Sequence, residues 1–344
     1  MDIRKPKIRL VHLQPLRITG GIECELTLAN LYEKPMYEAL SYEWGPLCPD
    51  DFRIKLGGQE HFVRENLWAA LRCLRSEEGV RTLWMDAICV DQSNIPERNH
   101  QVSQMGRVYS QASAVIAWIG TENYQDTIKS ENNVHLAQDF LHELNANRNL
   151  KLSRRQIAKY EKNMRSDDLG LKIYALMALC YRSCWTRLWV DQEVLLSQRG
   201  MVQCGSFTFN LDTFRRLFSA GLVWREFYRW ADDTAATKMW TSPCMRLFEL
   251  NKRNQLYNNQ HQTYMTMIQL MLRTSYTECG DARDKIFRLL NISAQCCRAA
   301  IPPDYSRSFE EIRQSVLEHH HSQHSIGNYD MGSRDLFKAV AEYL

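Results

Sequence analysis

The sequence lacks long apolar runs, cysteines at metal-site spacing and an excess of one charge. No apolar stretch is long enough to cross a bilayer, and the opening MDIRKPKIRLVHLQPL has no secretory apolar segment. The 11 cysteines are odd in number, irregularly spaced and without a CxxC motif, which favours reduced thiols over a disulfide framework. These absences predict a cytoplasmic protein without a membrane span.

Several motifs of common enzyme classes are missing as well. No GxGxxG, P-loop or GxSxG pattern occurs, so dinucleotide dehydrogenases, NTPases and serine hydrolases lose their usual support. The 43 basic and 40 acidic residues give a net charge of only +3, and they are spread along the chain. We therefore expect no nucleic-acid partner.

The first part of the chain alternates short apolar runs with amphipathic segments. Two stretches of alternating character predict an entry hairpin, at 8–13 and 23–28. Three apolar runs predict buried strands, at 37–42, 82–89 and 114–119. Between them we expect a helix capped by Asn66, with Leu67, Ala70, Leu71 and Leu74 as its apolar stripe, and a helix with Pro96 in its first turn.

Strands and helices in this order predict right-handed βαβ crossovers and a doubly wound, mainly parallel α/β sheet. The polar stretch 121–180 predicts a helical insertion. After it we expect a helix over 185–198, a strand over 201–204, and helices near 211–218, 265–272, 286–290 and from Ser308 onward. The expected domains are an α/β core at 1–220, which contains the insertion, and a helical C-terminal region at 221–344 that packs on it.

Polar side chains follow the predicted strands at the edge where open α/β sheets bind ligands. The first strand delivers Glu43, Trp44 and Gly45, the second delivers Asp86, Asp91 and Gln92, and the helix after it opens with Glu97, Arg98 and Gln101. Structural explanations also exist: Asp86 could accept turn amides, Asp91 or Asn94 could cap a helix, and Trp44 could fill the core.

Glu193 is the most informative carboxylate. In a continuous helix four residues share one face: Trp185, Trp189, Gln192 and Glu193. An acid among tryptophans either has a cationic partner, such as Arg187 or Arg98, or has a raised pKa and a functional role. The spacing leaves both interpretations open.

The histidines of the last predicted helix are a weak metal candidate. His319, His320, His321 and His324 could offer two imidazoles at i, i+4 spacing, but histidine runs of this kind are usually solvated, and no cysteine or carboxylate pattern completes a site. From the sequence we expect no bound metal.

Five segments occur in a characteristic order: YEALSYEWG, LWMDAICVDQSNIPERNHQVSQMGRVYSQASAVIAWIG, CWTRLWVDQEVLL, GDARDKIFRLLNIS and IPPDYS. With these segments the chain resembles the HET domain proteins of filamentous fungi, and the resemblance covers nearly the whole chain, from Ile8 to about Tyr305. It departs from them only slightly, with CVDQ where CINQ is commoner and FRLLNI where YALLGL is usual. The resemblance implies a heterokaryon incompatibility protein that triggers programmed cell death, self-associates and acts with other incompatibility proteins.

A more distant resemblance, to TIR domains, rests on SYEWG and SCWTRLWVDQEVLL. It implies a TIR-like sheet, places Glu193 at the position of the catalytic glutamate, and implies NAD as substrate with no prosthetic group. Cleaving the nicotinamide–ribose bond expels a neutral group, so one carboxylate suffices. The resemblance further implies that Trp44 stacks on a ring, that Arg98 contacts the diphosphate, and that Ser41, Tyr42, Glu43, Gly45, Asp86, Gln92, Gln101, Trp189 and Gln192 bind the substrate.

Two other functions are compatible with these residues. The domain could be a non-catalytic adaptor that acts by self-association, or a nucleotide sensor without turnover. The placement of Glu193, Asp86 and Trp44 discriminates between the enzyme and the adaptor: an open pocket lined by these residues favours the enzyme, and packing among satisfied partners favours the adaptor.

Overall fold

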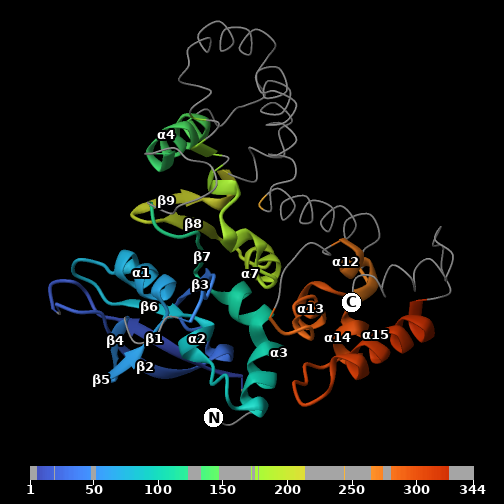
Figure 1. Cartoon of the computed structure of the whole chain (residues 1–344). Coiled ribbons are helices and arrows are strands. Elements are labelled where there is room, and N and C mark those ends of the chain that lie inside the picture. The colour runs from blue at the N-terminus through green and yellow to red at the C-terminus, as the bar shows by residue number, and fades with distance from the viewer. Residues whose placement is uncertain are drawn as a thin grey trace, which may run out of the picture.

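A central mixed sheet organises the fold in the computed structural model of the chain (Figure 1). The structure describes residues 6–18, 20–47, 52–122, 133–146, 172, 175–176, 178–213, 244, 265–273 and 280–324. Within these residues the sheet has nine strands. In spatial order they are β5 (Gln59–Phe62), β4 (Arg53–Leu56), β2 (Glu23–Asn30), β1 (Lys7–Leu13), β6 (Arg81–Trp84), β3 (Glu38–Tyr42), β7 (Ala114–Trp118), β8 (Gly200–Cys204) and β9 (Phe207–Asn210).

The α/β class is confirmed, but the expectation of a mainly parallel sheet is wrong. Strands β6, β3, β7 and β8 form a parallel centre. The entry hairpin places β1 antiparallel to both of its neighbours, and hairpins β4–β5 and β8–β9 close the two ends. The first of these end hairpins turns at Gly57 and Gly58, both with positive φ, as two-residue turns of this kind require.

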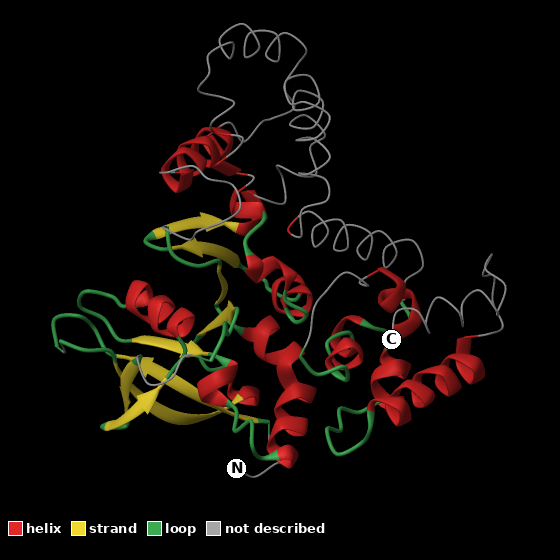
Figure 2. Cartoon of the chain, viewed as in Figure 1, coloured by secondary structure: helices red, strands yellow, loops and turns green. Residues whose placement is uncertain are grey.

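The helices and turns lie between and beside these strands (Figure 2). They are η1 (Leu31–Glu33), α1 (Glu65–Leu74), α2 (Asp86–Cys89), α3 (Ile95–Gln111), α4 (Asn133–Ala146), η2 (Ser183–Thr186), α7 (Val190–Leu195), α12 (Met267–Arg273), α13 (Asp284–Phe287), η3 (Leu290–Ile292), α14 (Gln295–Ala300) and α15 (Phe309–His324).

Local sequence signals explain where α1 and α3 form. The predicted stripe of α1 is buried, at Leu67, Ala70, Leu71 and Leu74. Helix α3 begins where Asn94 accepts a hydrogen bond from the Glu97 amide, with Pro96 in the first turn. The predicted cap of α1 is wrong: the helix begins at Glu65, and the Asn66 side chain instead donates to the Glu43 carbonyl and accepts from the Trp118 indole.

Two predicted elements near the site are divided in the structure. The apolar run 82–89 leaves the sheet after Trp84, because Cys89 closes a helical turn onto the Met85 carbonyl. The helix expected over 185–198 is a 3-10 turn, a break at Arg187 to Trp189, and the short helix α7. The side chain of Trp185 consequently lies in a separate buried cluster with β7, β8 and α4.

The C-terminal helices share a hydrophobic core with the first sheet strands. This core joins residues of β1, β3 and α3 to buried residues of α12, α13 and α15. Figure 1 shows α12 to α15 beside α3, and α7 lies close to one end of α3. The expected boundary at 220 and most of the insertion 121–180 lie outside the described residues, so the domain limits stay a prediction.

Among the described residues no helix has the length and apolar character needed to cross a membrane.

Candidate functional site

A cavity of about 540 Å³ opens beyond the carboxyl ends of β3 and β6, between α3, the α7 segment and the start of α13. This volume lies in the usual range of small-molecule sites. Eight of the predicted site residues line it: Glu43, Trp44, Gly45, Asp86, Gln92, Arg98, Gln101 and Trp189. Residues that follow different strands in the sequence are therefore brought to one cavity, as the strand order led us to expect.

Trp44, which follows β3, and Asp86, which follows β6, are in contact at the cavity wall. The Trp44 indole Nε1 donates to both Asp86 carboxylate oxygens at 3.0 Å. Gly45, with φ of +74°, lets the chain turn sharply directly after Trp44. Arg64 donates to the Gly45 carbonyl at 2.6 Å and lies over the Trp44 ring, so the indole is held by Asp86 at its Nε1 atom and by Arg64 over the ring.

Asp86 has a strongly perturbed carboxyl group. Burial raises its pKa to about 6, against the opposing effect of the Arg187 charge, and the Glu193 carboxylate adds to the increase. The predicted structural role is also present, since the carboxylate accepts the Ala87 amide at 2.8 Å. Asp86 is thus a carboxyl group at a cavity wall whose pKa lies close to neutral pH.

Glu193 lies behind this wall instead of on it. Its side chain is 1% exposed, and it accepts two hydrogen bonds from Arg187, at 3.0 and 3.3 Å, and one from the Ser41 hydroxyl. Tyr42 and Gln192 are also buried and do not line the cavity. Asn291 donates to the Gln192 side-chain oxygen at 3.0 Å. Four predicted site residues therefore form a layer behind the cavity.

Arg187 connects the two layers. It lines the cavity and at the same time pairs with Glu193. The surrounding carboxylates raise its pKa, although burial acts in the opposite direction. The break between η2 and α7 places Arg187 there, so the position of this guanidinium could not follow from a continuous helix.

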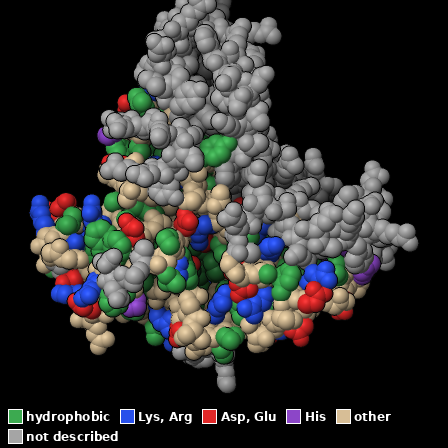
Figure 3. Space-filling view, in the orientation of Figure 1, with side chains coloured by type: hydrophobic (Ala, Val, Ile, Leu, Met, Phe, Trp, Pro, Cys, Tyr) green, Lys and Arg blue, Asp and Glu red, His purple; other side chains and the backbone are tan. Residues whose placement is uncertain are grey.

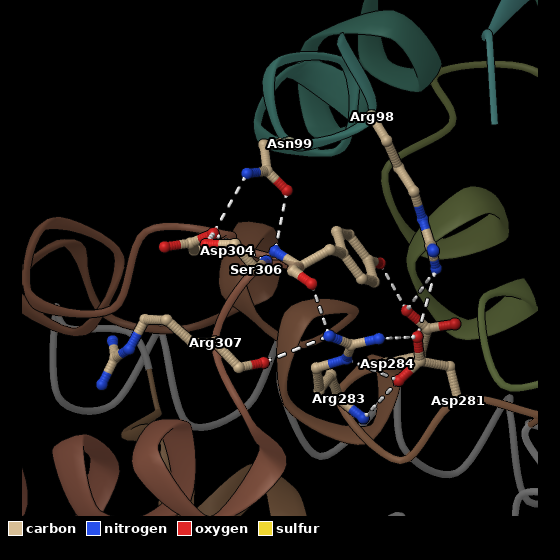
Figure 4. Close-up of polar contacts among 9 residues, drawn as sticks. Arg98, Asn99, Asp281, Arg283, Asp284, Asp304, Ser306 and Arg307 are labelled. Atoms are coloured by element: carbon tan, nitrogen blue, oxygen red, sulfur yellow. Dashed lines mark hydrogen bonds and ion pairs between the residues drawn. The ribbon is translucent and has the colours of Figure 1, made fainter. Parts of the chain in front are cut away.

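The C-terminal segments supply a wall that sequence reasoning missed (Figure 4). Arg98 reaches from α3 to Asp281 at 3.5 Å and Asp284 at 3.8 Å, and its guanidinium carbon lies 3.5 Å from the centre of the Tyr305 ring. The Tyr305 hydroxyl donates to Asp284, and Arg283 pairs with Asp281 at 2.9 Å. The signal was present in the segments GDARDK and IPPDYS, which carry these residues.

This wall is held against α3 by one further side chain. Asn99 accepts from the Tyr305 amide at 2.8 Å and donates to Asp304 at 3.3 Å. Arg283 also donates to the Tyr305 and Arg307 carbonyls (Figure 4). Since backbone groups are fixed on both sides, the Tyr305 ring has a defined position beside Arg98.

Residues 37–193 match the sequence profile of the family described as Heterokaryon incompatibility protein (HET). This protein carries a HET domain. Heterokaryon incompatibility protein 6, OR allele, of Neurospora crassa is 24% identical over 336 residues, covering 88% of this chain and 49% of the relative. The chain thus spans about half the length of that relative. No solved structure matches the chain.

The HET segment 37–193 holds most of the cavity, and the rest of the chain completes it. Gly280, Asp281, Asp284 and Tyr305 lie outside the matched segment but line the cavity. The fold explains this arrangement, because α12 to α15 share the core of the sheet.

The cavity is acidic although the chain is slightly basic. Its lining has four carboxylates, on Glu43, Asp86, Asp281 and Asp284, and two guanidinium groups, on Arg98 and Arg187. Outside it, basic and acidic side chains of the described residues are interspersed on the face shown in Figure 3. The local excess of acid favours a ligand that carries positive charge where it meets Asp86 and Glu43.

Proposed function

We propose that this HET domain protein acts in fungal heterokaryon incompatibility, and that it triggers cell death by cleaving the nicotinamide–ribose bond of NAD in the cavity beside Asp86. The observation that carries the proposal is the pairing of an aromatic platform, Trp44, with a carboxylate of raised pKa at one cavity wall. The name of the Neurospora relative supports the incompatibility role.

The lining suits the nicotinamide end of NAD. The nicotinamide ring is a flat cation, and flat cations bind well between aromatic rings and carboxylates. Trp44 and Trp189 offer rings, and Asp86 and Glu43 offer carboxylates. The resemblance to TIR domains implies that Arg98 contacts the diphosphate. Arg98 pairs with Asp281 and Asp284, so this contact requires the diphosphate to replace those carboxylates as the partner of the guanidinium.

The reaction needs one anion near the ribose. The bond between the ribose carbon and the nicotinamide nitrogen breaks, and both of its electrons leave with neutral nicotinamide. Positive charge then develops on the ribose, where an ionised Asp86 stabilises it. Water adds to the ribose carbon and releases a proton, which gives ADP-ribose. Asp86 is ionised above its pKa of about 6.

Glu193 keeps a role in this proposal through Arg187. Its carboxylate fixes the guanidinium that lines the cavity, and its negative charge raises the pKa of Asp86. Cleavage by Glu193 itself would require Arg187 and Ser41 to release it. The two carboxylates are therefore separable by substitution.

The test is nicotinamide release from NAD by the purified protein, both as isolated and under enforced self-association. We expect turnover that falls by a factor of about 100 or more in Asp86→Asn. Arg72→Gln, on the outer side of α1, is a matched control and should keep the activity. Equal turnover in the wild type and Asp86→Asn, or none in the assembled protein, would contradict the proposal.

A non-catalytic adaptor is the second candidate, and one observation favours it. Glu193 is packed and fully paired with Arg187 and Ser41, as expected for a structural network. This candidate predicts self-association without nicotinamide release. A nucleotide sensor predicts a third result, in which NAD raises the melting temperature but no nicotinamide appears.

A further inference from the structure

Two cysteines and two histidines meet where α14 packs against the last turns of α15. Cys296 and Cys297 lie on α14, and His319 and His324 lie on α15. One potential ligand atom from each residue lies within 4.8 Å of the other three. The two helices are in contact and lie side by side in Figure 1.

The spacing matches a tetrahedral metal site. The Nε2 atom of His324 lies 3.4 Å from the Cys296 sulfur and 3.8 Å from the Cys297 sulfur. With Zn–S and Zn–N bonds of about 2.3 and 2.05 Å, tetrahedral geometry separates sulfur and nitrogen ligands by about 3.6 Å. Both distances lie close to this value without any movement of the helices.

The cluster also contains one polar atom that lacks a protein partner. Buried Nε2 of His319 has no hydrogen-bond partner among the described residues, and neither does Nδ1 of the neighbouring His320. Buried polar nitrogen atoms are normally paired, so an unpaired one beside two thiols points to a missing ligand. Both cysteines are free thiols.

The cluster lies at the C-terminal end of α15, where a bound metal would have a structural role. Helix α15 buries Ile312 and Val316, but residues 321–323 in its last turn are exposed. The first turn is fixed by Ser308, which exchanges hydrogen bonds with Glu311. Among the described residues, the last turn has no buried apolar side chain that fixes it. A metal bound by residues of both helices would attach this turn to α14.

We propose that Cys296, Cys297, His319 and His324 bind one zinc ion, which fastens the end of α15 to α14. Two thiolates and two imidazoles are a common structural zinc set. The site is separate from the cavity, and the proposal does not depend on NAD cleavage. Sequence spacing hid this site because more than 20 residues separate the cysteines from the histidines.

The first test measures metal in the full chain after purification with zinc and dialysis. We expect about one zinc per chain in the wild type. In Cys296→Ser and in His324→Gln the zinc affinity should fall by a factor on the order of 100 or more. His321→Gln, on the same turn but outside the cluster, and Cys73→Ser, a distant free thiol, should keep the metal. Wild-type protein without zinc, or Cys296→Ser/His324→Gln protein with full zinc, would overturn the proposal.

A second test avoids the risk that a variant fails to fold. Cobalt(II) added to the wild-type chain should give the intense visible bands of a tetrahedral site and an ultraviolet band from thiolate bound to cobalt. Zinc should displace both signals. Cobalt spectra without the thiolate band would also overturn the proposal, because they would exclude the cysteines as ligands.

Discussion

Arg187 donates to both carboxylate oxygens of Glu193, at 3.0 and 3.3 Å, while the same guanidinium borders the cavity. The side chain of Glu193 is 1% exposed and that of Arg187 is 14% exposed. Removing either partner of such a buried ion pair is destabilising, because the remaining charge is neither solvated nor paired. The pair therefore contributes both to the folding stability of the protein and to the positive charge at the cavity wall.

Arg187→Met should destabilise the protein by about 3 kcal/mol, since it leaves the Glu193 carboxylate buried without its cation. The double variant Arg187→Met/Glu193→Gln should recover part of this loss, because the uncompensated charge is gone. Urea unfolding of the wild type, of the single variants Arg187→Met and Glu193→Gln, and of the double variant measures the difference. If the double variant is as unstable as the sum of both single variants, the two residues are not coupled.

Asp86 should make stability depend on pH between about 4 and 6. Its folded pKa of about 6 lies above the ordinary value of 3.8, so in this window the folded state keeps a proton that the unfolded state has lost. Stability should fall as pH rises through the window and level off above pH 6. The expected fall is on the order of 1–3 kcal/mol.

Asp86→Asn should remove this component, since asparagine does not titrate. The informative quantity is the unfolding free energy of the wild type minus that of the variant, measured from pH 4 to pH 7.5. A difference that stays constant over this range would show that Asp86 ionises normally in the folded protein.

The buried pair Asp191–Arg288 should be essential for joining the C-terminal helices to the HET segment. Both side chains are at most 2% exposed, and Arg288 also donates to the Leu188 carbonyl. Asp191→Asn should cost about 3–5 kcal/mol, because it removes the countercharge of a buried guanidinium. Thermal or urea unfolding measures the loss.

The matched comparison is the exposed pair Arg313–Glu310 on α15. Arg313→Gln should change stability by less than about 1 kcal/mol, because solvent screens this pair. Similar losses in Asp191→Asn and Arg313→Gln would mean that burial of the first pair does not strengthen it.

Gly106→Ala should destabilise the contact between α3 and the η3 turn. A Cβ at this position would lie 2.5–2.6 Å from the side chain of Asn291, so one of the two segments must move. We expect a loss of about 1–3 kcal/mol, which outweighs the better helix propensity of alanine. Gly79→Ala is the control, since its nearest neighbour would lie at 3.8 Å, and it should be close to neutral.

Much of the cavity could be predicted from the order of strands and polar residues. Glu43, Trp44, Asp86 and Arg98 were expected at the edge of the sheet, and all four line the cavity. The prediction works because strand ends of parallel βαβ units converge, whatever the details of packing. The cap of α3 is likewise a local interaction, and of the two candidate caps, Asp91 and Asn94, the structure selects Asn94.

The position of Glu193 could not be predicted in the same way. A helical face was expected to bring it to the cavity with Trp185, but the chain breaks between η2 and α7. Arg187 then occupies the cavity wall, and Glu193 pairs with it from behind. The cost of leaving a buried carboxylate unpaired is a tertiary effect, and sequence periodicity does not contain it.

The sequence by itself determined the elements around the first strands, the polar side chains that follow them and the similarity to HET domain proteins, because these depend on local spacing. Tertiary structure alone decided that Asp281, Asp284 and Tyr305 complete the cavity, that Glu193 lies behind Arg187, and that two cysteines meet two histidines. Each of these contacts joins segments that are far apart in the sequence and that packing of the core brings together. The order of residues therefore does not predict these contacts.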